Sequence, residues 1–280
     1  MREATEKTTL YLLNTDVYYE LYKCSRRSHG VLLMIHGFVS SSYSFRALIP
    51  YLRKKYDIIT VDLPGFGRSA KRHDFRYSFD NYSNLIAAFI THMALTNVTL
   101  IGHSMGGQVA LYTAKKFPNL VNYIVLLSSS GYLKRVKRSY VYATYLPFAQ
   151  TFIRRWLQKK DYKKAINQVV YNKKMVSDDV VREYSRPFNE EAFYDSLICL
   201  VRQREGDLTA SELQMISQPC LILWGEEDKI IPVRIGKRLA SDLPRSQFFS
   251  FKKTGHLVPE ERPKEVSQKI KRFLQNPLKR

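Results

Sequence analysis

The sequence is poor in cysteine. Its 280 residues include only Cys24, Cys199 and Cys220, which lie far apart and form no CxxC pair. An odd number of widely spaced cysteines predicts neither a disulfide framework nor a zinc site. We therefore expect three reduced, buried thiols.

Long apolar runs and a secretory leader are also missing. The apolar runs at 31–35 and 85–90 are far shorter than the roughly 18 residues of a membrane-spanning helix. The first residues carry Glu3 and Glu6 where a secretory signal has basic residues, and no apolar stretch with a small-residue cleavage site follows. These absences favour a cytoplasmic protein without a transmembrane helix.

Acidic residues are outnumbered, since 45 lysines and arginines stand against 25 aspartates and glutamates, giving a formal net charge of +20. Such an excess favours an anionic surface or ligand and carries no information on the fold. Glycine and proline are not in excess and no segment repeats, which excludes disordered, collagen-like and solenoid chains. With 45% hydrophobic residues, the length fits one large domain or a domain with an insertion.

Short apolar runs rich in β-branched residues alternate with helical patterns along the chain. They span residues 31–36, 57–62, 98–102, 123–128, 219–224 and 246–251. Runs bounded by turn signals in this way are typical of the buried strands of a parallel sheet. One helical stripe between them is formed by Tyr82, Leu85, Ile86, Phe89 and Met93. The fold class is therefore α/β.

Residues 131–215 interrupt this alternation, because they contain several helical stretches and no convincing strand. One of these helices is expected to begin at Ser177 as its N-cap. We expect a helical lid inserted in the core, and we call residues 131–215 the helical insertion. The chain then divides into a first part of the core at 1–130, the helical insertion at 131–215, and a second part of the core at 216–280.

Basic and aromatic side chains are interleaved in the first half of the helical insertion. From 131 to 175 there are twelve lysines and arginines against Asp161 alone, a net charge of +11. The aromatic residues among them are Tyr140, Tyr142, Tyr145, Phe148, Phe152 and Trp156. This mixture fits a solvated helix face over an apolar underside, or weak contact with an anionic membrane surface. Nucleic acid is not expected as a partner.

The sequence GHSMGG at 102–107 follows an apolar run and opens a helical pattern that extends to about Phe117. A sharp turn from strand to helix requires small residues on both sides of its apex, and it exposes the apical hydroxyl at the C-terminal edge of the sheet. Ser104 is therefore the candidate nucleophile. The alternative is a glycine-rich turn whose serine only caps the helix.

A serine hydroxyl needs an imidazole to accept its proton and a carboxylate to orient that imidazole. His256 follows the last predicted strand at the same sheet edge and is the candidate base. The other histidines are assigned to the surface (His29, His73 and His92) or to structural or pocket positions (His36 and His103).

The loop after the strand at 219–224 offers three carboxylates. We favour Asp228 over Glu226 and Glu227, because the chain order Ser104, Asp228, His256 then places acid and base each after a late strand. Glu226 and Glu227 remain alternatives.

Two backbone N–H groups are expected to stabilise the oxyanion. One belongs to Met105 at the start of the helix, and the other to Phe38 in the loop after the first core strand. The GxGxxA pattern at 65–70 is followed by a charged loop and not by a helix, so a dinucleotide site is not predicted. We expect neither a cofactor nor a metal ion.

Five motifs in their order resemble the α/β-hydrolase superfamily, in particular its lid-bearing bacterial esterases. They are HGF at 36–38, DLPGFGRS at 62–69, GHSMGG at 102–107, LILWGEEDKIIP at 221–232 and GHLVPEERP at 255–263. The resemblance covers nearly the whole chain and implies an eight-stranded, mostly parallel sheet, the triad Ser104–Asp228–His256 and a pocket roofed by the helical insertion. The motifs are specific for the fold and the triad, and not for the substrate.

The sequence thus predicts a cofactor-independent serine hydrolase that cleaves a small-molecule carboxylic ester. The GHSMGG turn at 102–107, which we call the elbow, also resembles that of meta-cleavage-product hydrolases. Hydrolysis of a carbon–carbon bond is therefore the first alternative. Some relatives with an intact triad act as ligand receptors or signalling modules, which is the second. The oligomeric state is not predicted.

Overall fold

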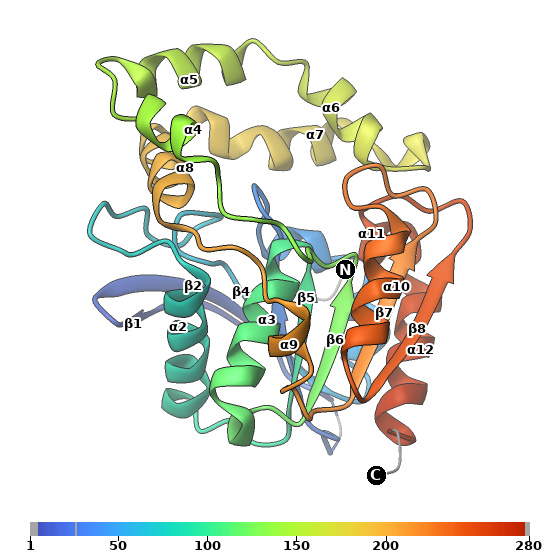
Figure 1. Ribbon diagram of the computed structural model, residues 1–280. Coiled ribbons are helices and arrows are strands. Elements are labelled where there is room, and N and C mark those ends of the chain that lie inside the picture. The colour runs from blue at the N-terminus through green and yellow to red at the C-terminus, as the bar shows by residue number, and fades with distance from the viewer. Residues whose placement is uncertain (1–4, 26, 278–280) are drawn as a thin grey trace.

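The computed structural model describes residues 5–25 and 27–277, whose eight strands form one sheet in the order β1-β2-β4-β3-β5-β6-β7-β8 (Figure 1). The strands are β1 Glu6–Leu12, β2 Thr15–Tyr22, β3 Val31–Ile35, β4 Asp57–Val61, β5 Val98–His103, β6 Tyr123–Leu127, β7 Cys220–Gly225 and β8 Ser246–Phe251. Strands β1 and β2 pair in antiparallel fashion, as do β2 and β4, and all other pairs are parallel. The expected eight-stranded, mostly parallel sheet is confirmed.

Strands β3 to β8 lie within one residue of the limits expected from the sequence. The hairpin β1–β2 was not found among the apolar runs, because β1 is an edge strand with the sequence EKTTLYL and no buried residue. An exposed edge strand lacks the continuous apolar run that marks a strand buried on both faces.

Helices cover both faces of the sheet. The helices of the core are α1 Ile49–Leu52, α2 Phe79–His92, α3 Met105–Lys116, α10 Val233–Asp242, α11 Val258–Glu261 and α12 Pro263–Gln275. Alternate side chains of β3 point to opposite faces: Leu33 and Ile35 pack with the cluster that includes α2 and α3, whereas Leu32 and Met34 pack with the cluster that includes α1 and α12. The core therefore has three layers, and Ser104 lies at the edge of the middle layer, where β5 ends and α3 begins.

The helical insertion connects β6 to β7 and contains helices and no strand. Its helices are α4 Arg138–Ala143, α5 Ala149–Gln158, α6 Tyr162–Val169, α7 Asp178–Ser185, α8 Glu191–Gln203 and α9 Ala210–Leu213. Helix α7 begins with Ser177 as its N-cap, as expected, and the Ser177 hydroxyl accepts a hydrogen bond from the Val180 N–H. In Figure 1, α4 to α8 lie beyond one end of the sheet, while α9 runs beside α3.

The three thiols are free, but only one of them is fully buried. Cys220 lies inside β7, as expected. The expectation is wrong for Cys24, which lies beyond the end of β2, and for Cys199, which lies on a partly exposed side of α8. No helix in the described part of the chain is long and apolar enough to cross a membrane.

Candidate active site

Ser104 occupies a tight turn between β5 and α3. Its backbone has φ 53° and ψ −119°, a conformation that non-glycine residues adopt rarely and mostly at functional sites. The neighbouring chain crowds this turn, because a Cβ atom at Gly106 would lie 2.2 Å from the Ile35 carbonyl oxygen and one at Gly102 would lie 2.3 Å from the Gly106 oxygen. The glycines of GHSMGG therefore allow β3, β5 and α3 to meet directly at the serine.

His256 and Asp228 are hydrogen-bonded to each other. The distance from His256 Nδ1 to Asp228 Oδ2 is 2.8 Å, and the two side chains are 7% and 0% exposed. The other carboxylate oxygen of Asp228 accepts hydrogen bonds from the N–H groups of Ile230 and Ile231, each at 2.9 Å. A carboxylate oxygen accepts hydrogen bonds, so Nδ1 is the donor in this contact, and in a neutral imidazole Nε2 then carries the lone pair that can accept a proton.

The carboxylates of the two alternative acids are hydrogen-bonded to groups other than His256. The Glu226 carboxylate accepts a hydrogen bond from the Ser250 hydroxyl at 2.9 Å, and that of Glu227 accepts one from the Thr254 N–H at 2.8 Å. The imidazole of His256 is hydrogen-bonded to neither of them in the described part of the chain. Glu227 instead joins the loop of the acid to the loop of the base.

Ser104 is partly exposed, and its hydroxyl makes no hydrogen bond to any described residue. The serine and the imidazole are thus brought to the same sheet edge without being hydrogen-bonded. Such bonds are often long in an enzyme without substrate and shorten when the substrate binds.

His103, directly before the serine, points toward the loop of His256. Its Nε2–H donates to the His256 carbonyl oxygen at 3.0 Å, and the two rings lie 5.0 Å apart between centroids. Burial, together with the nearby His256 ring, lowers the pKa of His103 to about 3. His103 therefore stays neutral and holds the backbone of the loop that carries His256, which is a structural role.

The two expected oxyanion donors lie at the elbow. Among the described residues, neither the Phe38 N–H nor the Met105 N–H donates a hydrogen bond. The loop that carries Phe38 rests on the elbow, since a Cβ at Gly37 would lie 2.9 Å from that of Ser104. His36 fixes this loop by donating from Nδ1 to the Gly37 carbonyl at 2.7 Å and accepting from the Leu63 N–H at 3.0 Å.

Two contacts of this site were not predicted from the sequence. The His256 N–H donates to the Val169 carbonyl oxygen at the end of α6, at 2.8 Å. The Glu261 carboxylate accepts from the Gly255 N–H on one oxygen and from the N–H groups of Tyr171 and Asn172 on the other. The helical insertion is therefore hydrogen-bonded to the loop of the candidate base. No local pattern marks the contacts of Val169, Tyr171 and Asn172, because they join segments about 90 residues apart.

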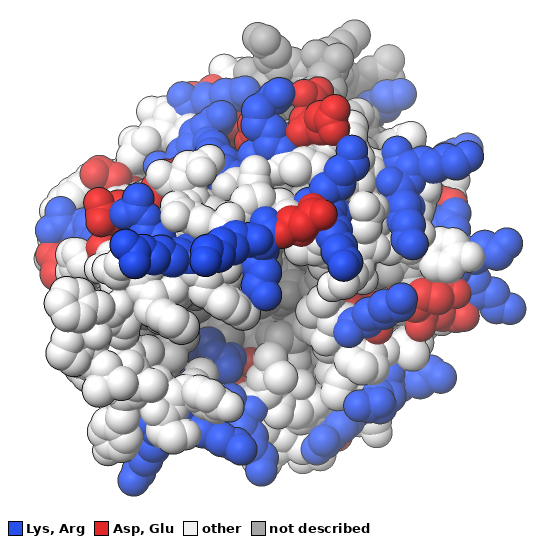
Figure 2. All heavy atoms as spheres, turned by 90° about the horizontal axis from the view of Figure 1, so that it is seen from above, with Lys and Arg blue, Asp and Glu red and all other residues white. Residues whose placement is uncertain are grey.

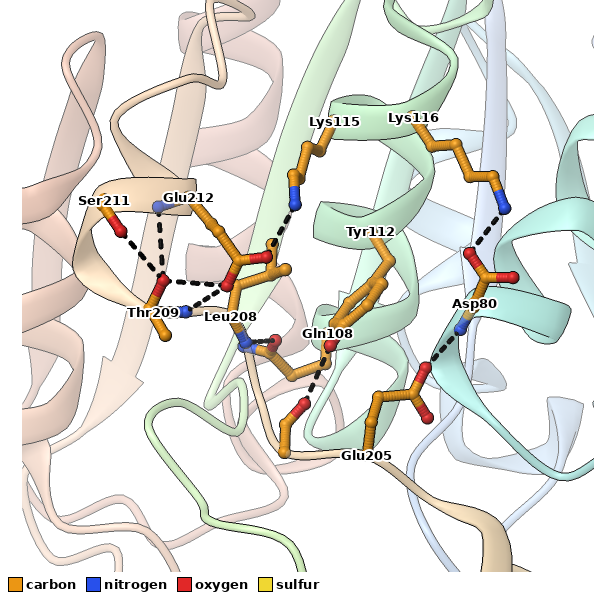
Figure 3. A network of polar contacts seen from close by, with 11 residues as sticks. Asp80, Gln108, Tyr112, Lys115, Lys116, Glu205, Leu208, Thr209, Ser211 and Glu212 are labelled. Atoms are coloured by element: carbon orange, nitrogen blue, oxygen red, sulfur yellow. Dashed lines mark hydrogen bonds and ion pairs between the residues drawn. The ribbon is translucent and has the colours of Figure 1, made fainter.

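The returning end of the helical insertion is bound to α3, the helix that starts at the elbow (Figure 3). Lys115 pairs with Glu212 at 2.6 Å, the Tyr112 hydroxyl donates to the Gly206 carbonyl at 2.8 Å, and Gln108 accepts from the Leu208 N–H at 3.1 Å. These contacts connect the segment between α8 and β7 to α3 along most of the length of α3.

His29, His73 and His92 are exposed, as expected. No group of three or more histidine, cysteine or acidic side chains could hold a metal ion in the described chain. A cavity of about 960 Å³ lies between β2, α1 and α7, but its lining contains none of the three triad candidates, and it is separate from the elbow.

Comparisons with known proteins show the family and the fold of the chain. Residues 30–263 match the family model described as the alpha/beta hydrolase fold. An uncharacterized hydrolase of Bacillus subtilis, YugF, is 44% identical over 259 residues, which cover 92% of this chain and 94% of that protein. A 2-hydroxy-6-oxo-2,4-heptadienoate hydrolase of Pseudomonas putida is 26% identical over 257 residues, covering 87% and 88%. The solved meta-cleavage product hydrolase of Pseudomonas fluorescens has a TM-score of 0.79 at 20% identity and covers 96% of this chain and 97% of its own.

Proposed function

The chain belongs to the α/β-hydrolase family, and on that premise we propose that it is a serine hydrolase that cleaves carboxylic esters. Ser104 is the nucleophile, His256 the general base and acid, and Asp228 the residue that orients His256. The substrate is a small-molecule ester, and the helical insertion serves as the lid over its pocket.

The reaction follows from these roles. Ser104 Oγ attacks the ester carbonyl carbon while its proton passes to His256 Nε2, and the N–H groups of Phe38 and Met105 bind the oxyanion. The tetrahedral intermediate collapses, and the leaving alcohol takes the proton from His256. Water then attacks the acyl-enzyme by the same route, giving the free acid and regenerating Ser104.

The observation that carries the proposal is the hydrogen bond between Asp228 and His256. A buried carboxylate that accepts two backbone N–H bonds as well as the Nδ1–H has one fixed orientation, and it stabilises the imidazolium that forms when the serine loses its proton. Because Glu226 and Glu227 are held by other donors, Asp228 is the acid that fits this role.

Hydrolysis of esters is favoured over hydrolysis of an anionic dienoate by the residues nearest the elbow. The segments 36–40, 102–110 and 254–260 contain no lysine or arginine. A site made of such segments offers no fixed cation for a substrate carboxylate, whereas a neutral ester needs none.

Cleavage of a carbon–carbon bond is the second candidate, since the Pseudomonas putida relative is named for a 2-hydroxy-6-oxo-2,4-heptadienoate. The same three residues would serve that reaction. The two candidates are distinguished by substrate: rapid turnover of simple neutral esters supports the first, and selective turnover of a vinylogous dienoate supports the second.

The test uses chromogenic esters of increasing acyl chain length together with a serine-directed phosphonate. Ser104→Ala should lower kcat by about 10⁴-fold or more, because the nucleophile is removed and only one hydroxyl is lost from the fold. The matched control is Ser241→Ala, which removes an exposed hydroxyl on α10 and should leave the rate unchanged. Mass spectrometry should find the phosphonate on the peptide that contains Ser104.

Two results would contradict the proposal. One is a phosphonate adduct on another residue, and the other is full esterase activity in Ser104→Ala. Tight ligand binding with negligible turnover of every ester and of the dienoate would instead indicate a receptor with a retained triad.

A further inference from the structure

We propose that α4, α5 and the loop between them form a docking surface for an anionic lipid bilayer. Large side chains project from this part of the helical insertion, each between 54% and 84% exposed. They are Tyr140, Tyr142, Leu146, Phe148, Phe152 and Trp156, which we call the outer patch. Clustered exposed apolar side chains on a folded chain mark an interaction surface.

Helix α5 has apolar residues on two sides. Ile153 and Leu157 pack against the core on its inner side, whereas Phe148, Phe152 and Trp156 recur every four residues on its outer side. A helix on an ordinary water-exposed surface is polar on its outer side. Neither α4 nor α5 has a fully buried residue. Because Phe148, Phe152 and Trp156 are each more than half exposed, the apolar outer side of α5 is not covered by the described part of this chain.

The charge around the outer patch selects an anionic partner. Twelve lysines and arginines lie between 131 and 175, and among described residues only Arg154 and Lys163 form ion pairs, with Glu191 and Asp178. The ammonium of Lys160 lies 4.1 Å from the centre of the Trp156 ring, so basic and aromatic groups are in contact. Figure 2 shows this face from above, where Lys and Arg side chains are spread widely and an uncharged area lies on the side of α4 and α5.

A bilayer fits this combination better than a nucleic acid does. Tyrosine and tryptophan side chains favour the boundary between headgroups and acyl chains, and lysines and arginines beside them attract anionic headgroups. Leu146, Phe148 and Phe152 carry no polar atom and gain from entering the acyl region. A single-stranded nucleic acid would stack its bases on the aromatic rings but would make no comparable use of Leu146.

The docking surface lies on the same helical insertion that contacts the loop of His256. The end of α6 is hydrogen-bonded to His256 through the Val169 carbonyl oxygen, so docking through α4 and α5 would hold the site close to the bilayer. The substrates would then be esters dissolved in the membrane. This last step rests on the proposed function, whereas the docking surface does not.

Binding is measured by sedimentation of the purified full chain with vesicles. Vesicles of phosphatidylcholine with phosphatidylserine should bind the chain, and vesicles of phosphatidylcholine alone should bind it at least about tenfold more weakly. Because surface charges are screened by salt, raising NaCl should weaken binding to the anionic vesicles. Equal binding to both kinds of vesicle, or binding to neither, would overturn the proposal.

The outer patch is tested with the triple variant Phe148→Ser, Phe152→Ser and Trp156→Ser. Its binding to anionic vesicles should fall at least about tenfold, because three apolar side chains no longer enter the bilayer. The matched control removes exposed apolar side chains elsewhere, with Met215→Ser and Ile230→Ser, which are 70% and 53% exposed. The control should bind like the natural sequence, and an equal loss in both variants would contradict the assignment.

The basic residues are tested by charge reversal. Lys137→Glu with Lys159→Glu should weaken binding to anionic vesicles about tenfold or more. The control, Lys237→Glu with Lys264→Glu, changes the net charge equally on exposed residues of the core. If both pairs have the same effect, binding depends only on net charge, and the docking surface is wrongly placed.

Tryptophan fluorescence gives a second readout without altering the patch. The sequence has two tryptophans: Trp156 is 54% exposed and Trp224 is fully buried. Anionic vesicles should shift the emission to shorter wavelength, and lipids with brominated acyl chains should quench the Trp156 component. Sedimentation with vesicles but without quenching would mean that the patch does not enter the bilayer, and would overturn the proposal.

Four further results separate the remaining outcomes. An ester dissolved in anionic vesicles should be hydrolysed more slowly by the outer-patch variant, with the rate for a water-soluble ester unchanged. If neither ester is hydrolysed, the proposed function fails while the binding results still test the docking surface. Tight binding to a single-stranded oligonucleotide without vesicle binding, or dimerisation that the outer-patch variant abolishes, would assign the patch to another partner.

Discussion

The two halves of the helical insertion differ in charge and in the surroundings of their aromatic residues. From 131 to 175 the net charge is +11, and from 176 to 215 four basic residues stand against nine acidic ones, a net charge of −5. In the first half Phe152 is 74% exposed, whereas in the second half Phe193 and Tyr194 are fully buried against the core. The second half attaches the helical insertion to the core, and the first half presents a surface.

The hydrogen bonds follow the same division. The second half returns to the core along α3 through contacts that include Lys115 with Glu212 and Gln108 with Leu208 (Figure 3). The first half is joined to the loop of the candidate base, His256, mainly near Val169 and Tyr171. Chemistry, attachment and surface contact are thus separable, and substitutions in each region should affect different measurements.

The largest expected effect comes from a substitution at the candidate acid, which lies outside both halves of the helical insertion. Asp228→Asn should lower kcat by about 10²- to 10⁴-fold, because the imidazole loses the carboxylate that fixes its tautomer. Binding to anionic vesicles should not change, since Asp228 is buried and is not part of the outer patch. Steady-state kinetics and sedimentation measure the two quantities. If Glu226→Gln or Glu227→Gln is the more damaging change, the acid has been assigned wrongly.

The next prediction compares one phenylalanine from each half. Phe193→Ala should lower the free energy of unfolding by about 3–5 kcal/mol, because it removes a fully buried ring that packs against Phe66 and Phe188. Phe152→Ala should change it by no more than about 0.5 kcal/mol. Urea unfolding followed by circular dichroism measures both. Equal costs would show that Phe152 is also packed against the rest of the chain in solution.

The smallest effect concerns the attachment of the second half. The hydrogen bond from Lys115 and those from Thr209 lower the pKa of Glu212 to about 2, against burial, which raises it. Because the Glu212 side chain is about a third exposed, water screens the pair, and Glu212→Gln should cost about 1 kcal/mol or less at neutral pH. The control Glu191→Gln removes a more exposed pair with Arg154 and should cost less.

The contribution of Glu212 to the free energy of unfolding changes with pH in a defined direction. Its pKa in the folded chain lies below the ordinary value of 4.5, so its contribution to stability is fully present above that value and is lost as the pH falls toward 2. The difference in unfolding free energy between Glu212→Gln and the natural sequence should therefore shrink over this range. A difference independent of pH would mean that the ion pair contributes nothing and that the variant acts through the capping contacts of Thr209.

Part of the fold follows from local sequence and part does not. The buried strands β3 to β8 are each continuous apolar runs, so local patterns find them within one residue. Strand β1 is not found, because the sequence EKTTLYL becomes a strand only by pairing with β2, through backbone groups that carry no sequence signal. The GHSMGG elbow is found because the crowding at Gly106 acts within a few residues of Ser104.

The sequence by itself determined the α/β class and proposed Ser104 as nucleophile and His256 as base, because small residues at a tight turn and the order of motifs leave few arrangements. Only the tertiary structure decided which carboxylate meets His256, since Glu226, Glu227 and Asp228 are adjacent in sequence and differ only in where the loop points each one. It also decided that the aromatic residues of α5 face outward. A helix with apolar residues on two sides has two equivalent ways to pack, and contacts with α8 and the core select the one that packs Ile153 partly buried against the core and leaves Phe152 exposed.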